Sequence, residues 1–205
     1  PRLIVQIAPA VAQAAMNSGV AARPLADLGA YRDSLQRFVY STGFIMKPMF
    51  VAAKAEPRQI VYAEGEDERV LRAVQVVVDE RLAKPILIGR PAVVERRIEL
   101  YGLRIRPGAD FDLVNPESDP RYREYWEEYH RLTERRGVSA RYAQIEMRRR
   151  NTAIGAMAIH RGEAAGMLCG TFGAHGLHLQ YIDQILGRRR GASAYYAMNA
   201  LILPK

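Results

Sequence analysis

The residues best suited to bind a ligand lie in one glycine-rich stretch, residues 170–176, with the sequence Gly-Thr-Phe-Gly-Ala-His-Gly. The apolar residues 165–169 before it predict a strand, and the inward-facing apolar positions of residues 177–186 predict a helix. Open parallel sheets bind ligands at such strand ends, where glycines let backbone N–H groups approach an anion. The candidate ligand contacts are Gly170, Thr171, Gly173, His175 and Gly176.

The spacing of these glycines is neither the dinucleotide fingerprint nor a Walker A loop. A tight strand–helix turn with surface histidines is therefore the alternative interpretation. The phosphates of a ligand would need arginine partners, and two runs lie nearest in sequence, residues 148–150 and the run that begins at Arg188. Exposed helix ends and turns also carry such runs, so the sequence leaves both interpretations open.

Two further features could carry chemistry. The acidic turn at residues 64–68 follows a short apolar run, and its carboxylates could hold Mg²⁺. Helix capping with an Asp67–Arg69 or Glu68–Arg72 ion pair is the favoured alternative. Cys169 would be a nucleophile only with a lowered pKa, and a small buried core thiol is favoured over that role.

These features must be positioned by an α/β fold. Residues 60–90 read as a strand, an acidic turn, an amphipathic helix and a second strand. The helix is predicted by Val70, Leu71, Val74 and Val78, which share one helical face. A strand–helix–strand unit of about 30 residues is typical of a parallel sheet, and we expect three-layer α/β subdomains.

Composition limits the class of protein. The chain has 205 residues, of which 49% are hydrophobic, and a net charge of +8 from 30 Lys and Arg against 22 Asp and Glu. One cysteine excludes an internal disulfide framework, and the first residues do not resemble a signal peptide, so we expect a cytoplasmic location. The charge alone would allow an RNA-binding module, but we expect no nucleic-acid partner and no membrane association.

We expect three regions. Residues 1–54 read as a helical linker, residues 55–150 as a first, partial α/β subdomain, and residues 151–205 as the truncated start of a second. The chain begins with Pro1 and stops directly after an apolar run, so we expect a piece of a longer protein.

The sequence also resembles a known family. Residues 58–91 resemble the start of the phosphotransacetylase-like domain that forms the C-terminal half of bacterial NADP-dependent malic enzymes. The N-terminal residues resemble the last helix of the malic catalytic half, so the likeness extends across the fusion point of these hybrid proteins. The stretches that carry it are residues 2–12, 19–24, 58–91, 107–116, 122–126, 151–156 and 161–171.

The resemblance implies a parent protein whose other half binds malate, NADP and Mg²⁺ or Mn²⁺, while no cofactor is expected in this stretch. It implies that this half has the phosphotransacetylase fold, forms homo-oligomers and senses acetyl-CoA in a cleft between subdomains. In true transferases a histidine and hydroxyl residues follow the strand end that corresponds to Cys169 and Gly170. Gly173 and Ala174 stand there in this chain. We therefore expect no catalysis by the chain itself, and a phosphate acetyltransferase is the alternative function.

We expect self-association for a second reason. Four aromatic residues follow at helical spacing, and with the helices of residues 1–54 they offer more apolar surface than one chain would cover. The four residues are Tyr122, Tyr125, Trp126 and Tyr129.

Overall fold

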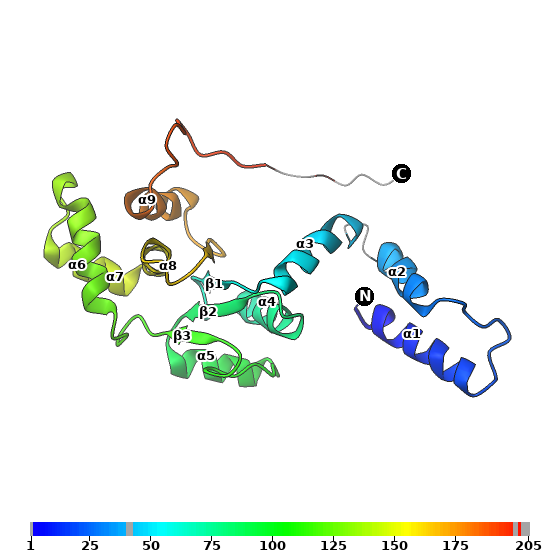
Figure 1. Cartoon of the computed structure of the whole chain (residues 1–205). Coiled ribbons are helices and arrows are strands. Elements are labelled where there is room, and N and C mark those ends of the chain that lie inside the picture. The colour runs from blue at the N-terminus through cyan, green and yellow to red at the C-terminus, as the bar shows by residue number, and fades with distance from the viewer. Residues whose placement is uncertain (1, 40–42, 199–200, 202–205) are drawn as a thin grey trace. The chain divides into compact units, whose positions relative to one another are not determined.

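The structure is a computed structural model that describes residues 2–39, 43–198 and 201. It divides into two compact units, one formed by residues 1–52 with 197–205 and the other by residues 53–196 (Figure 1). No helix of the described residues is both long enough and apolar enough to cross a bilayer.

The smaller unit is helical, as expected. Its helices are α1 (Arg2–Asn17), α2 (Leu28–Val39) and most of α3 (Gly43–Ala55). α1 packs against α2 and buries Val5, but Leu3, Ile4, Ile7 and Val11 are exposed.

Two prolines lie inside helices of this unit, Pro9 in α1 and Pro48 in α3. A proline inside a helix costs one backbone hydrogen bond. The apolar residues on both sides of each proline favour a continuous helix, and this preference outweighs the loss.

The larger unit is built on a parallel sheet of four strands in the order β3-β2-β1-β4. The strands are β1 (Gln59–Tyr62), β2 (Lys84–Ile88), β3 (Asp112–Val114) and β4 (Gly166–Leu168). The helices are α4 (Glu68–Asp79), α5 (Pro91–Leu100), α6 (Tyr122–Thr133), α7 (Ala140–Arg149), α8 (Asn151–His160) and α9 (His175–Ile185), with a 3₁₀ turn at Glu134–Arg136. The predicted α/β class is confirmed.

Side chains alternate between the two faces of this sheet, because successive residues of a strand point to opposite sides. Val61, Ile86, Ile88 and Val114 join a core with α6, α7, α8 and α9. Tyr62 and Leu87 face the other way, into a second core with α4 and α5. The sheet is therefore the middle layer of three, with α4 and α5 on one side and α8 on the other (Figure 1).

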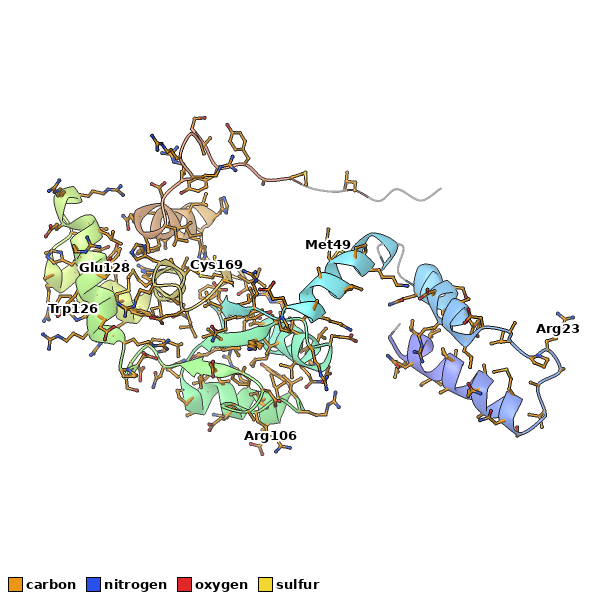
Figure 2. The ribbon with its side chains drawn as sticks, viewed as in Figure 1. Arg23, Met49, Arg106, Trp126, Glu128 and Cys169 are labelled. Carbon is orange, nitrogen blue, oxygen red and sulfur yellow. The ribbon has the colours of Figure 1, made fainter. Side chains whose placement is uncertain are left out.

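The aromatic residues of α6 belong mainly to the core. Tyr125 and Tyr129 are buried, and Tyr122 and Trp126 are half-buried and pack against the same cluster. Figure 2 shows Trp126 on α6 near Glu128, which accepts hydrogen bonds from Arg131 at the solvent side. Burial of Tyr125 and Tyr129 therefore places this part of the stripe in the core, so these two residues add no exposed apolar surface for self-association.

The expected boundary between residues 150 and 151 does not separate two units. β4, which was assigned to a second subdomain, pairs in parallel with β1 through Ile60↔Gly166, Val61↔Met167 and Tyr62↔Leu168. Backbone hydrogen bonds between strands that lie a hundred residues apart thus join both stretches in one sheet. The apolar stretch near the end of the chain, residues 194–203, also predicts a strand from its sequence, but residues 194–198 have no strand structure and the rest lies mostly outside the described residues.

Candidate functional site

A pocket of about 480 Å³ lies at the C-terminal ends of the strands. Residues that follow all four strands line it, together with side chains from α5, α7 and the start of α8. This edge is where open parallel sheets bind ligands. The lining residues are Glu64, Glu66, Asp67, Gly89, Arg90, Arg97, Pro116, Glu117, Arg148, Asn151 and Phe172.

Glu64, the second residue after β1, is the most buried carboxylate of this pocket, with 6% of its surface exposed. Its Oε1 accepts a hydrogen bond from the backbone N–H of Gly170 at 3.0 Å. Its Oε2 is buried and has no hydrogen-bond partner among the residues that the structure describes. A buried carboxylate oxygen without a donor is costly, so this atom is a natural acceptor for a group that enters the pocket.

Glu66 organises the neighbouring wall. Both oxygens of its carboxylate accept hydrogen bonds from the Arg90 side chain at 2.9 Å, and Oε1 also accepts from the Arg90 backbone N–H. The hydrogen bonds from Arg90 hold the pKa of Glu66 below its usual value. Arg97 of α5 donates to the backbone carbonyl of Glu66. These contacts fix the turn after β1 to the turn after β2.

Asp67 and Arg69 connect the turn after β1 to the glycine-rich loop. Asp67 caps α4 by accepting from the backbone N–H of Arg69, as the sequence predicted, and also pairs with the Arg69 side chain at 2.9 Å. Arg69 then donates to the backbone carbonyl of Thr171 at 2.9 Å. Together with the bond between Glu64 and Gly170, this contact holds the loop against β1.

Arg148 and Asn151 form the opposite wall. The guanidinium carbon of Arg148 lies 4.4 Å from the centre of the Tyr122 ring, which is a close cation–π contact. Among the described residues no carboxylate pairs with Arg148. Asn151 is the first residue of α8, whose N-terminus therefore faces the same pocket.

The glycine-rich loop itself contributes one side chain to the pocket, that of Phe172, which is 72% exposed. Gly170 and Gly173 on either side of it have φ values of 95° and 97°, a conformation that residues with a side chain rarely adopt. A Cβ at Gly173 would also lie 3.1 Å from Nε2 of His178. Both glycines are thus required for the path of the loop.

His178 of α9 braces the loop from beneath. Its Nε2 lies 3.0 Å from the carbonyl oxygen of Phe172, and its Nδ1 lies 2.7 Å from the hydroxyl of Thr152. A carbonyl can only accept, so Nε2 carries the proton in the neutral ring and Nδ1 accepts from Thr152. The histidine therefore has a structural role that orients Phe172.

Cys169 follows β4 at the edge of the sheet (Figure 2). Burial raises the pKa of its thiol, and the charge of Glu64 raises it further. A raised pKa leaves little thiolate at neutral pH, which argues against an activated nucleophile. The thiol is only half-buried and belongs to neither core cluster, so the expectation of a buried core thiol is not met either.

The structure brings together only part of the predicted site. Gly170, Thr171 and Gly173 lie in the loop that borders the pocket, and the Thr171 hydroxyl is buried without a partner. His175 and Gly176 are exposed in the first turn of α9 and are not part of the lining. Arg188 lies elsewhere, beside Asp183 and over the Tyr195 ring.

Several lining residues were not predicted as ligand contacts. Glu64 was read as part of a capping turn, and the expected pairs of Asp67 with Arg69 and Glu68 with Arg72 are confirmed. Phe172 lies inside the predicted loop but was not among the predicted ligand contacts. Among the described residues no group of three or more metal-binding side chains could hold a metal ion.

Comparison with known families decides the membership of this chain. The model of one family, phosphate acetyl/butaryl transferase, matches residues 44–205. The chain belongs to this family. The larger unit, the sheet and the pocket all fall within the matched residues.

Curated relatives extend the match to the whole chain. The NADP-dependent malic enzyme of Salmonella typhimurium is 53% identical over 204 residues, which are 100% of this chain and 27% of that protein. The NAD-dependent malic enzyme of Rhizobium meliloti is 54% identical over 202 residues, 98% of this chain and 26% of that protein. The chain thus spans about a quarter of the length of these relatives, and its resemblance to the transferase-like part of malic enzymes is confirmed.

Solved structures of this family share the fold. The EutD phosphotransacetylase from Staphylococcus aureus aligns with a TM-score of 0.63 and 22% identity, covering 73% of this chain and 45% of that chain. A phosphotransacetylase from Streptococcus pyogenes gives the same TM-score at 24% identity. At these identities the likeness establishes the architecture alone.

Proposed function

We propose that this chain is the regulatory and oligomerising, phosphotransacetylase-like part of an NADP-dependent malic enzyme. The observation that carries the proposal is the match over the full chain, at more than half identity, to one quarter of proteins named malic enzymes. In this proposal another part of the protein converts malate to pyruvate by oxidative decarboxylation. We further propose a cytoplasmic location, in keeping with a single, half-buried cysteine.

The proposed cofactors, NADP with Mg²⁺ or Mn²⁺, belong to the malate-converting part. Two relatives that are almost equally identical to this chain are named for different cofactors, one NADP and the other NAD. Sequence identity in this stretch therefore does not indicate which nicotinamide cofactor the protein uses. The cofactor preference must therefore be measured on the protein itself.

The proposed effector is acetyl-CoA, with the pocket at the strand ends as part of its binding site. Three features support this assignment: the pocket lies at the ligand-binding edge of the sheet, it is lined by arginines, and it borders the glycine-rich loop. Arg148 is the arginine available for a phosphate, because Arg90 is paired with Glu66 and Arg97 is bonded to a backbone carbonyl.

The alternative function is a phosphate acetyltransferase that moves acetyl between CoA and phosphate. Family membership favours it, as does the 36% identity over 121 residues to the phosphate acetyltransferase of Nitratidesulfovibrio vulgaris. Gly173 and Ala174 argue against it, because neither has a side chain that could act in proton transfer. Cys169, with its raised pKa, does not replace such a group.

An assay of the full-length product of the gene separates the two functions. We expect NADP reduction with malate and a divalent cation, a change of that rate when acetyl-CoA is added, and no acetyl phosphate formed from acetyl-CoA and phosphate. The matched variant is Phe172→Ala, which changes an exposed pocket residue and should weaken the acetyl-CoA effect while leaving the basal rate intact. Acetyl phosphate formation without malate conversion would contradict the proposal and establish the alternative.

Self-association is proposed on the surface of α1. Leu3, Ile4, Ile7 and Val11 are exposed apolar residues on this helix, opposite the buried Val5. The double variant Ile7→Lys, Val11→Lys should have a lower particle mass by light scattering than the wild type, because charged groups are costly to bury in an interface. Gln6→Lys, an exposed change on the same helix, is the control and should leave the mass unchanged. An unchanged mass for the double variant would remove α1 from the interface.

A further inference from the structure

Several charged groups of the pocket already have partners. Glu66 pairs with Arg90, and Asp67 pairs with Arg69, which approaches from outside the lining. Arg97 donates to a backbone carbonyl. Among the lining groups that remain, three of different chemistry suit a nucleotide, namely the Oε2 atom of Glu64, the guanidinium of Arg148 and the ring of Phe172, while Glu117 and Asn151 also line the pocket.

The Glu64 carboxylate can accept one further hydrogen bond through its Oε2 atom. Its Oε1 is already bonded to Gly170, so only Oε2 is free, and a single uncharged donor group suits it best. A guanine base would present two adjacent N–H donors that need both oxygens of a carboxylate. The exocyclic amino group of adenine presents one donor on that edge and matches the single free oxygen.

Phe172 offers a flat apolar surface. Its side chain is 72% exposed although it lines a pocket, and its backbone carbonyl is anchored by His178. Exposed aromatic rings are the surfaces on which nucleic-acid bases stack. The neighbouring glycines with positive φ place this residue outside any helix or strand, at the pocket wall.

Arg148 offers the charge that a phosphate requires. The Tyr122 ring covers one face of the guanidinium and leaves its N–H groups directed along its plane. Four carboxylates and three guanidiniums line the pocket, so its positive charges are outnumbered and the pocket as a whole does not attract anions strongly. Phosphate binding would therefore depend on direct contact with Arg148.

We propose that this pocket binds the adenine nucleotide unit of its ligand, with the base stacked on Phe172, its amino group donating to Glu64 Oε2, and a phosphate on Arg148. The proposal rests on the proposed function to the extent that acetyl-CoA carries such a unit. Free adenine nucleotides share this chemistry. The acetyl end of acetyl-CoA then lies outside this pocket.

The test compares AMP with IMP, in which an oxygen replaces the amino group at position 6 of the purine and N1 carries a hydrogen. The full-length protein is titrated with each nucleotide by calorimetry. We expect AMP to bind about tenfold more tightly, because IMP places an oxygen acceptor against the Glu64 carboxylate. In Glu64→Gln the preference should vanish or reverse, since an amide can donate to that oxygen. Glu117→Gln, a change of another lining carboxylate, should leave the preference as it is.

The outcomes separate this inference from the proposed function. Equal affinities for AMP and IMP, in a protein that does bind acetyl-CoA, would overturn the adenine assignment and leave the proposed function standing. A preference for AMP that depends on Glu64, without binding of acetyl-CoA, would support the adenine site and overturn the proposed effector. Competition between AMP and acetyl-CoA would identify acetyl-CoA as the source of the adenine unit.

A second variant covers the case in which Glu64→Gln does not fold. Phe172→Ala alters an exposed side chain, so the fold should be retained. It should weaken the binding of AMP and of IMP by similar factors, on the order of tenfold, because stacking of the base does not depend on the group at position 6. Unchanged AMP affinity in Phe172→Ala would overturn the proposal.

Discussion

Leu87→Ala is expected to lower the free energy of unfolding by about 2–5 kcal/mol, the typical cost of truncating a fully buried leucine. Leu87 lies in the middle strand β2, is 0% exposed, and is paired with Tyr62 on one side and Leu113 on the other. Its side chain fills the core between the sheet and helices α4 and α5. Removing three carbon atoms leaves a cavity that two hydrogen-bonded neighbouring strands cannot close.

Urea denaturation followed by circular dichroism measures this effect, and Leu100→Ala is the matched control. Leu100 ends α5 and is 71% exposed, so the same chemical change there should alter stability by no more than about 0.5 kcal/mol. Similar losses in the two variants would mean that the layer formed by α4 and α5 is not packed on the sheet as described.

The local elements of the larger unit could be read from the sequence because their signals are local. The face formed by Val70, Leu71, Val74 and Val78 predicted α4, and three of these residues are buried against the sheet. The acidic residues at its start predicted the cap that Asp67 provides. The short apolar runs predicted β1 and β2, which the structure extends by one or two residues toward the N-terminus.

Long-range pairing was not accessible in the same way. The apolar run that became β4 shows that a strand exists, but nothing in it specifies β1 as the partner. A βαβ unit normally joins neighbouring strands, and here two strands, β2 and β3, and the helices from α4 to α8 lie between β1 and β4 along the chain. The division at residue 150 followed from reading the second run as a new sheet.

The site shows the same limit at the level of side chains. The glycines at 170 and 173 marked the loop because positive φ angles and close approaches require them. The sequence does not show where the side chains of the two arginine runs point. The position of a residue on a helix determines its face, but not the residue that it meets on the neighbouring element. Arg148 reaches the pocket, whereas Arg188 turns toward Asp183 and Tyr195.

Gly65 connects the fold to the site, because it lies in the turn after β1 between two residues that line the pocket, Glu64 and Glu66. Its backbone N–H donates to the carbonyl of Ile88 at 3.0 Å, so the turn after β1 crosses directly over the end of β2. A Cβ at this position would lie 2.8 Å from that carbonyl oxygen, 2.8 Å from Cβ of Leu87 and 3.0 Å from the N of Ile88. These are atoms of the central strand and cannot move aside as a side-chain end would.

Gly65→Ala should therefore destabilise the larger unit by about 1–3 kcal/mol, the range for overpacking in a rigid environment. For a chain of 205 residues this corresponds to a fall in melting temperature of roughly 2–12 °C in a calorimetric scan. The control is Gly176→Ala in α9, where an added Cβ meets no atom within 4 Å and alanine favours the helix, so stability should hold or rise slightly. Because relief of the clash must displace the turn that carries Glu64, the variant should also lose the preference for AMP over IMP at temperatures where it is still folded. A variant that melts at the temperature of the wild type and keeps this preference would contradict the packing described here. It would show that a Cβ at position 65 does not come within 2.8 Å of the Ile88 carbonyl oxygen.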